Sequence, residues 1–101
     1  MGVIMFKIVI EENVLSRLRE MLEDEDSCVR VREYQLGGGC RTRIILGLGI
    51  DEFDEDEDEK IEVEGVPFIA DADFLLRYGR EFSVSFNAEG QMAVEALAPQ
   101  E

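Results

Sequence analysis

The sequence contains no histidine and no tryptophan, and it has only two cysteines and two prolines. The absence of histidine excludes catalysis by Ser-His, Cys-His or His-Asp pairs, and it excludes every metal site that needs an imidazole ligand. Two cysteines without a disulfide-scaffold spacing are typical of a protein with reduced thiols. We therefore expect a cytoplasmic protein that is not an enzyme.

Basic residues are also scarce, because 10 Lys and Arg stand against 24 Asp and Glu, for a net charge of -14. Nucleic acids and anionic membranes attract basic surfaces, so this charge argues against both as partners. No hydrophobic run reaches the length of a bilayer-spanning helix, and the first residues lack the layout of a signal peptide. A chain of 101 residues is expected to form one domain, residues 1–101.

The first half of the chain alternates between strand and helix patterns. Hydrophobic periodicity predicts a strand at residues 5–10 and an amphipathic helix at residues 13–24, with Asn13 as the helix N-cap. Two further strands are predicted at residues 28–35 and 42–50.

These two strands predict a hairpin around three consecutive glycines, with Gln35 opposite Arg41 and Cys28 opposite Leu48. The two cysteines would then lie about 20 Å apart along the strands, too far for a disulfide or a shared metal site. Gly47 and Gly49 interrupt one face of the second strand, which indicates a bulge or the close approach of another element.

Residues 51–59 contain eight acids and only one other residue, Phe53. Such a run repels itself and is expected to form a solvated acidic loop that contributes little to the core. Replacing Asp54, Asp56 and Asp58 together by asparagine should then leave stability unchanged or raise it slightly. The run does not fit an EF-hand, because Glu59 occupies the position of the required glycine.

The second half of the chain is predicted to be mostly strands. Two short strands hinge at Gly65, Asp71 caps a short helix that ends at Gly79, and a hairpin turning through Gly90 closes the domain. Residues 97–101 are expected to be a frayed tail. The fold class is therefore α+β, a mixed β-sandwich or barrel with an N-terminal amphipathic helix and one short helix.

The most informative stretch is Gly37-Gly38-Gly39-Cys40-Arg41. Three glycines free the backbone from the limits that a Cβ imposes, and they present one thiol beside a guanidinium. The stretch is compatible with a plain hairpin loop, with ligand or metal binding at Cys40, or with an anion held by backbone N–H groups beside Arg41. It matches neither a Walker A pattern nor a complete Gly-x-Gly-x-x-Gly.

The order of these motifs resembles the HesB-like family of A-type iron–sulfur cluster carrier and assembly proteins. The shared features are a first strand and helix, the Val29-Arg30-Val31 strand, the Gly38-Gly39-Cys40 loop, the Asp51-Glu52 pair, the segment 64–71, and a short helix with a closing hairpin through Gly90. The resemblance covers about residues 5–96 and implies a HesB-like fold with a role in iron–sulfur cluster assembly.

The resemblance assigns Cys40 as the ligand of a cluster or of iron, with Gly37, Gly38, Gly39 and Arg41 as the supporting loop. The family's C-terminal Cys-Gly-Cys has no counterpart in residues 94–101. A cluster normally has four thiolate ligands, so it would be held transiently and shared between subunits of a homodimer or with added thiols. Arg41 and Arg43 place positive charge near the thiolate and would favour it.

Two other hypotheses about function remain open. The alternative is a divergent HesB-like interaction module that binds no metal and whose acidic face meets a basic protein surface. An enzyme with Cys40 as nucleophile would lack a histidine to activate the thiol. The expected partners are therefore proteins, either those of iron–sulfur assembly or one with a basic surface.

Overall fold

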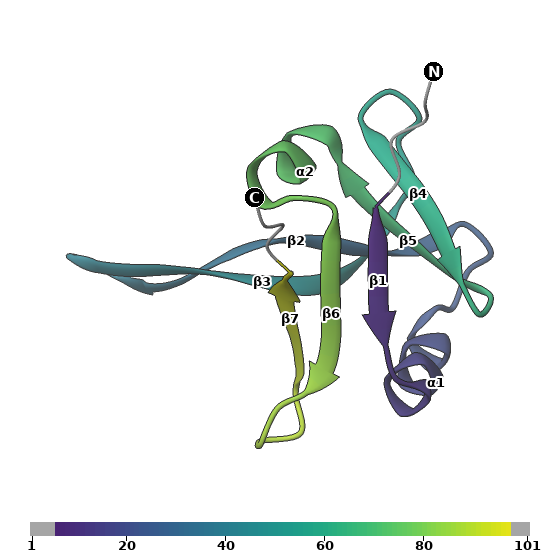
Figure 1. Ribbon diagram of the computed structural model, residues 1–101, viewed down its shortest axis with the longest axis horizontal. Helices are drawn as coiled ribbons and strands as arrows, with labels where there is room; N and C mark the ends of the chain where they lie inside the picture. Colours follow the sequence, from purple (N-terminus) through teal and green to yellow (C-terminus); the bar gives the residue numbers. More distant parts are fainter. Residues whose placement is uncertain (1–5, 98–101) are drawn as a thin grey trace.

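The computed structural model of the chain describes residues 6–97. The elements follow the order β1 (Lys7–Ile10), α1 (Glu12–Met21), β2 (Ser27–Gly38), β3 (Arg41–Glu52), β4 (Asp58–Val63), β5 (Val66–Asp71), α2 (Ala72–Tyr78), β6 (Glu81–Phe86) and β7 (Met92–Ala96). They form a three-stranded sheet in the order β1-β6-β7 and a four-stranded sheet in the order β3-β2-β5-β4 (Figure 1). The α+β class is confirmed, while the distinction between sandwich and barrel stays a prediction.

One hydrophobic cluster joins the two sheets and the two helices. Its fully enclosed members include Leu18 of α1, Val29 of β2, Phe68 of β5 and Phe82 of β6. Both sheets are mixed, since β1 pairs with β6 and β2 pairs with β5 in parallel, whereas the other pairs are antiparallel. The strand predicted at residues 5–10 begins at Lys7, and position 5 lies outside the described residues.

Helix α1 packs Val14, Leu15 and Leu18 into this cluster, as its periodicity predicts. Its boundaries differ from the prediction, because the helix spans Glu12–Met21 and its N-cap is Glu11, whose side chain makes no capping hydrogen bond. The prediction that Asn13 is the N-cap is therefore wrong. The amide favours capping positions, but the apolar stripe fixes the register of the helix, and that register puts residue 13 inside the first turn.

The predictions for the second half of the chain hold closely. The Asp71 carboxylate accepts a hydrogen bond of 2.7 Å from the Phe74 N–H at the start of α2, and Gly79 ends the helix with a φ of 95°. Gly65, with a φ of 84°, turns the chain between β4 and β5. The C-terminal hairpin turns through Gly90. Of the tail predicted at residues 97–101, Leu97 donates its N–H to the Glu81 carbonyl oxygen at 2.8 Å, and positions 98–101 lie outside the described residues.

The acidic segment at residues 51–59 is not a solvated loop throughout. Asp51 and Glu52 belong to β3, and Asp58 and Glu59 belong to β4. The Asp58 side chain is only 1% exposed. The prediction of a wholly solvated run is therefore wrong at Asp58. Its burial leads us to expect that asparagine at position 58 lowers stability, in place of the unchanged stability expected from the sequence. Among residues 6–97, no helix is long and apolar enough to cross a membrane.

Candidate functional site

The central feature is a long arm made by β2 and β3, whose tip carries Cys40 (Figure 1). The two strands pair continuously from Ser27 opposite Glu52 to Gly38 opposite Arg41. The turn therefore consists of only Gly39 and Cys40. The predicted register was wrong, because Gln35 lies opposite Ile44, not Arg41, and Cys28 lies opposite Asp51, not Leu48.

The reason for this difference lies in the glycines themselves. Gly37 and Gly38 continue the strand pairing and do not form a loop, and Gly39 enters the turn with a φ of 64°. Two-residue hairpin turns need such a left-handed position, which glycine occupies without steric cost. At Gly37 a Cβ would lie 2.5 Å from the Arg41 carbonyl oxygen, so no other residue fits there without a backbone shift.

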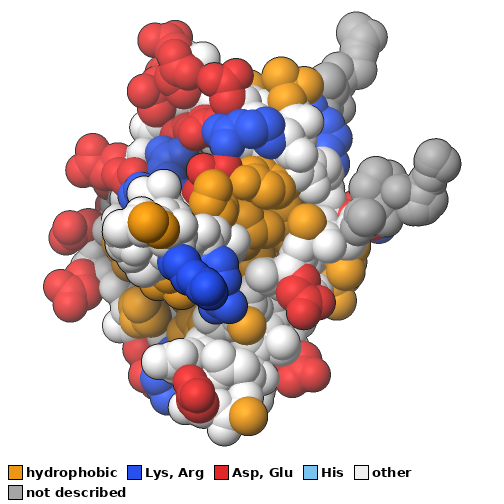
Figure 2. All heavy atoms as spheres, turned by 90° about the vertical axis from the view of Figure 1, so that its left-hand side faces the viewer, with side chains coloured by type: hydrophobic (Ala, Val, Ile, Leu, Met, Phe, Trp, Pro, Cys, Tyr) orange, Lys and Arg blue, Asp and Glu red, His pale blue; other side chains and the backbone are white. Residues whose placement is uncertain are grey.

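The tip is open to solvent. Residues 35–45 are all exposed, because the arm extends past the hydrophobic cluster that holds its base. A shallow hollow of about 490 Å³ lies at the tip, lined by Leu36, Gly37, Cys40, Arg41, Thr42 and Arg43. Figure 2 views the molecule from this end and shows basic side chains beside an apolar area. Of the four predicted loop residues, Gly37 and Arg41 line this hollow together with Cys40, while Gly39 shares the turn with Cys40 and Gly38 pairs opposite Arg41.

Cys28 lies at the opposite end of the arm. It is buried, its Sγ lies 3.9 Å from the Asp26 carbonyl oxygen, and burial raises the pKa of its thiol. Ten strand steps separate it from the turn, which corresponds to about 30 Å. Both cysteines are free, so the prediction of two separated thiols is confirmed. Of the two thiols, Cys40 is the exposed one.

The ligand set at the tip is small. Within the described part of the chain, no three side chains of His, Cys, Asp or Glu gather in a way that could hold a metal ion. Of the residues that line the hollow at the tip, Cys40 is the one of these four types.

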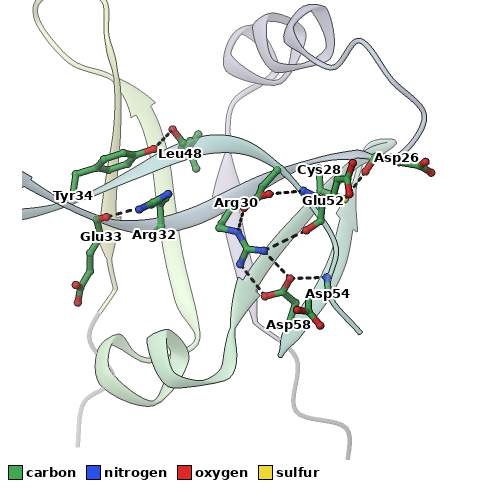
Figure 3. Close-up of polar contacts among 11 residues, drawn as sticks. Asp26, Cys28, Arg30, Arg32, Glu33, Tyr34, Leu48, Glu52, Asp54 and Asp58 are labelled. Carbon is green, nitrogen blue, oxygen red and sulfur yellow. Dashed lines mark hydrogen bonds and ion pairs between the residues drawn. The ribbon is translucent and has the colours of Figure 1, made fainter. Parts of the chain in front are cut away.

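A charge cluster around the buried Asp58, at the base of the arm, was missed by sequence reasoning (Figure 3). The Arg30 guanidinium donates hydrogen bonds of 2.8 and 2.7 Å to the two carboxylate oxygens of Asp58, and one of 2.8 Å to Asp51. The Asp54 N–H donates to Asp58 at 2.8 Å. This cluster ties the end of β3 to the start of β4 and orders the acidic segment.

The cluster also shifts the acidity of its carboxyls. Burial acts to raise the pKa of Asp58, but the hydrogen bonds from Arg30 and from the Asp54 N–H outweigh it and hold that pKa below its usual value. The pKa of Asp51 is lowered by the Glu52 N–H and by Arg30. The signal in the sequence was Arg30 between two buried valines, Val29 and Val31, because a guanidinium drawn into the core needs a carboxylate partner.

A second polar contact anchors the arm to α2. The Glu33 carboxylate accepts hydrogen bonds from the Tyr78 hydroxyl at 2.5 Å and from the Arg77 guanidinium. The hydrogen bond to this carboxylate raises the pKa of Tyr78. Because Glu33 lies near the middle of β2, the contact fixes how the arm leaves the body of the protein.

The position of the Tyr34 side chain explains why residues 47 and 49 of β3 are glycines. Its ring lies across Gly47, where a Cβ would come within 2.8 Å of two ring carbons, and its hydroxyl donates to the Leu48 carbonyl oxygen at 3.0 Å (Figure 3). The Arg32 guanidinium stacks over the same ring at 5.0 Å. At Gly49 a Cβ would lie 2.9 Å from the Tyr34 hydroxyl oxygen. Of the two predictions for Gly47 and Gly49, a bulge or the close approach of another element, the second is confirmed, because β2 supplies Tyr34 and pairs with β3 without a break.

No family model matches the chain. It is 31% identical over 85 residues to a candidate iron–sulfur cluster insertion protein ErpA of Nitrosospira multiformis, in a match that covers 82% of this chain and 66% of that protein. It is 32% identical over 62 residues to the iron–sulfur cluster insertion protein ErpA of Marinobacter nauticus, covering 60% of this chain and 56% of that protein. The chain thus spans between about half and two thirds of the length of these two relatives.

A longer match joins the chain to a candidate ErpA protein of Methylibium petroleiphilum. The two are 31% identical over 90 residues, and the match covers 86% of this chain and 73% of that protein. It extends over most of both chains, which agrees with the shared order of motifs along the sequence. The chain therefore belongs to the family of ErpA iron–sulfur cluster insertion proteins.

Proposed function

We propose that this protein takes part in iron–sulfur cluster assembly and holds a cluster, or iron, transiently as cargo at Cys40. Family membership supports the role, since the relatives are named as cluster insertion proteins. The observation that carries the residue assignment is the position of the thiol. Cys40 is exposed at the end of an arm that lifts it away from the body, where a second protein can reach it.

The cargo must be shared. A cluster normally has four thiolate ligands, and the tip supplies one from each chain. Two arms meeting tip to tip would supply two, and a small thiol such as glutathione or the recipient protein would supply the others. A cluster held in this way is exposed and labile, which suits a carrier and not a stable redox centre.

The neighbouring residues have distinct supporting roles in this proposal. Gly37, Gly38 and Gly39 form the narrow end of the arm, and Arg41 places positive charge beside a thiolate-ligated cluster, which is anionic. No step of this handover needs a general base, which agrees with a carrier that is not an enzyme and has no histidine. Two free thiols fit a reducing compartment such as the cytoplasm.

Anaerobic reconstitution with ferrous iron, sulfide and glutathione tests this proposal. We expect a coloured protein with visible thiolate-to-iron absorbance, whose colour fades on dilution and on removal of glutathione because the ligands come from separate molecules. Analytical ultracentrifugation with detection in the visible range would show whether the coloured species is a dimer. A cluster that survives dilution and gel filtration as a monomer would contradict shared ligation.

The second candidate is an interaction module without metal. The observation that favours it is the single thiol at the tip, because one ligand holds no cluster alone. This candidate predicts a colourless protein after reconstitution under every condition, with an acidic surface that binds a basic protein.

A further inference from the structure

Charge is divided unequally between the outer part of the arm, residues 34–50, and the rest of the protein. Residues 34–50 contain Arg41 and Arg43 and no acid, for a charge of +2, while the total for the chain is -14. The remaining residues therefore carry -16. In Figure 2, which views the molecule from the end of the arm, basic side chains lie beside the apolar area near the middle of the face, and acidic side chains line its left margin.

The two arginines of the tip, Arg41 and Arg43, are also free of ion pairs among residues 6–97. Arg30, Arg77 and Arg80 each pair with a carboxylate of the protein. Among residues 6–97, no carboxylate lies within ion-pair distance of Arg41 or Arg43, and neither guanidinium donates a hydrogen bond within the protein. Two adjacent unpaired guanidinium groups in a strongly acidic protein are a specific attraction for a carboxylate-rich partner.

Strand β3 also offers backbone and apolar contacts. It is the edge strand of its sheet, and no described strand pairs with its outer side. Its side chains alternate, so Arg41, Arg43 and Ile45 lie on one face and Thr42 and Ile44 lie on the other. Ile44 is 55% exposed. A long exposed edge with apolar side chains is a template for the addition of another strand.

From these features we propose that the outer edge of β3, residues 41–46, binds an extended acidic segment of a recipient protein as an added strand. Alternate carboxylates of that segment pair with Arg41 and Arg43, and the intervening apolar side chains cover Ile44. The segment then runs directly beside the Cys40 thiol. The identification of the partner as a cluster recipient rests on the proposed function, whereas the binding itself needs no cluster.

The acidic segment of a second copy of this chain is the competing occupant. Two of its carboxylates are already used, because Asp51 and Asp58 bind Arg30 within their own molecule. Its ends are also strands of the sheet and cannot extend along another β3. A separate acidic segment meets neither obstacle.

The test uses the metal-free protein and a fluorescein-labelled peptide of about ten alternating Glu and Val residues, with binding measured by fluorescence anisotropy. The same peptide with Lys in place of Glu is the charge control. The variant is Arg41→Glu with Arg43→Glu. The matched variant is Lys7→Glu with Arg17→Glu, which changes the net charge equally on β1 and α1, away from the arm.

We expect the acidic peptide to bind at the edge of β3 and the Lys peptide not to bind there. The affinity for the acidic peptide should decrease as the salt concentration rises. The arm variant should lose about tenfold or more in affinity, because two charge-assisted contacts are replaced by repulsion, and the matched variant should lose much less. A peptide with N-methyl groups on the amides that face β3 should bind at least about tenfold more weakly.

Equal losses in the two variants, equal binding of the N-methylated peptide, or no binding of the acidic peptide would overturn the proposal. Self-association of the protein would also overturn the proposal if the Arg41→Glu with Arg43→Glu variant abolishes it and the acidic peptide does not compete with it. A second copy of the chain would then occupy the edge of β3. Cluster absorbance, measured separately, reports on the proposed function. A protein that binds the peptide and stays colourless on reconstitution would refute only the cargo role.

Discussion

The Arg30 guanidinium and the Asp58 carboxylate form a two-pronged ion pair, with nitrogen-to-oxygen distances of 2.8 and 2.7 Å, beneath the acidic segment. The Asp58 side chain is 1% exposed and that of Arg30 is 14% exposed. The pair joins a strand of the arm to the strand that follows the acidic segment. It is therefore the contact that converts a self-repelling run into an ordered connection.

Asp58→Asn should destabilise the protein by roughly 2–4 kcal/mol, because it leaves the Arg30 charge buried with only Asp51 as its carboxylate partner. Urea unfolding at neutral pH measures this loss. Asp56→Asn is the matched control, since that side chain is exposed, and it should change the free energy of unfolding by less than about 0.5 kcal/mol. Equal effects at the two positions would show that the ion pair contributes nothing.

The contribution of Asp58 should depend on pH. Its pKa is lowered in the folded state, so the unfolded chain binds more protons as the pH falls, and the stabilisation is lost in acid. It should be complete above the ordinary aspartate pKa of about 3.9 and decrease below it. The difference in unfolding free energy between the wild type and Asp58→Asn should thus be larger at neutral pH than in acid. A constant difference would contradict the ion-pair account.

Gly47→Ala should destabilise the protein by about 1–2 kcal/mol, because the new methyl group would overlap the Tyr34 ring. Gly38→Ala is the control on the paired strand, where a Cβ meets nothing within 4 Å. Thermal or urea unfolding compares the two. In the double variant Tyr34→Ala with Gly47→Ala the penalty should shrink, and strict additivity would contradict the packing of Tyr34 over the glycine.

The two thiols should differ strongly in reactivity. Cys40 is exposed, whereas Cys28 is buried and burial raises the pKa of its thiol, which lowers the fraction of reactive thiolate. With Ellman's reagent at neutral pH, one thiol should react quickly and the second only after denaturant is added. Mass spectrometry of the modified peptide identifies the fast site, and fast modification of Cys28 would contradict its burial.

Local patterns in the sequence were enough to predict the elements of the second half. Asp71 and Gly79 are strong boundary signals for α2, because a capping carboxylate and a left-handed glycine act within a single turn. The apolar periodicity of α1 also predicted which of its side chains are buried, although it did not predict the N-cap. The separation of Cys28 from Cys40 also followed from strand pairing, although the register was off.

Features that depend on pairing between distant segments could not be predicted. The partner of Arg30 lies 28 residues away, and a run of eight acids gives no hint that one of them is buried. The predicted register at the tip was wrong because three consecutive glycines are typical of a loop. In the structure Gly37 and Gly38 instead pair with β3 and lengthen the hairpin. The unpaired edge of β3 emerged only from the strand order of the whole sheet.

The most direct test of the central claim compares Cys40→Ser with Cys28→Ala in the same anaerobic reconstitution. Iron and sulfide bound per chain and visible absorbance are measured, and unfolding curves confirm that both variants are folded. The assignment of Cys40 as the cluster ligand predicts that Cys40→Ser binds no cluster, while folded Cys28→Ala retains the wild-type absorbance. Cluster absorbance that survives Cys40→Ser, or that disappears only in folded Cys28→Ala, would contradict it.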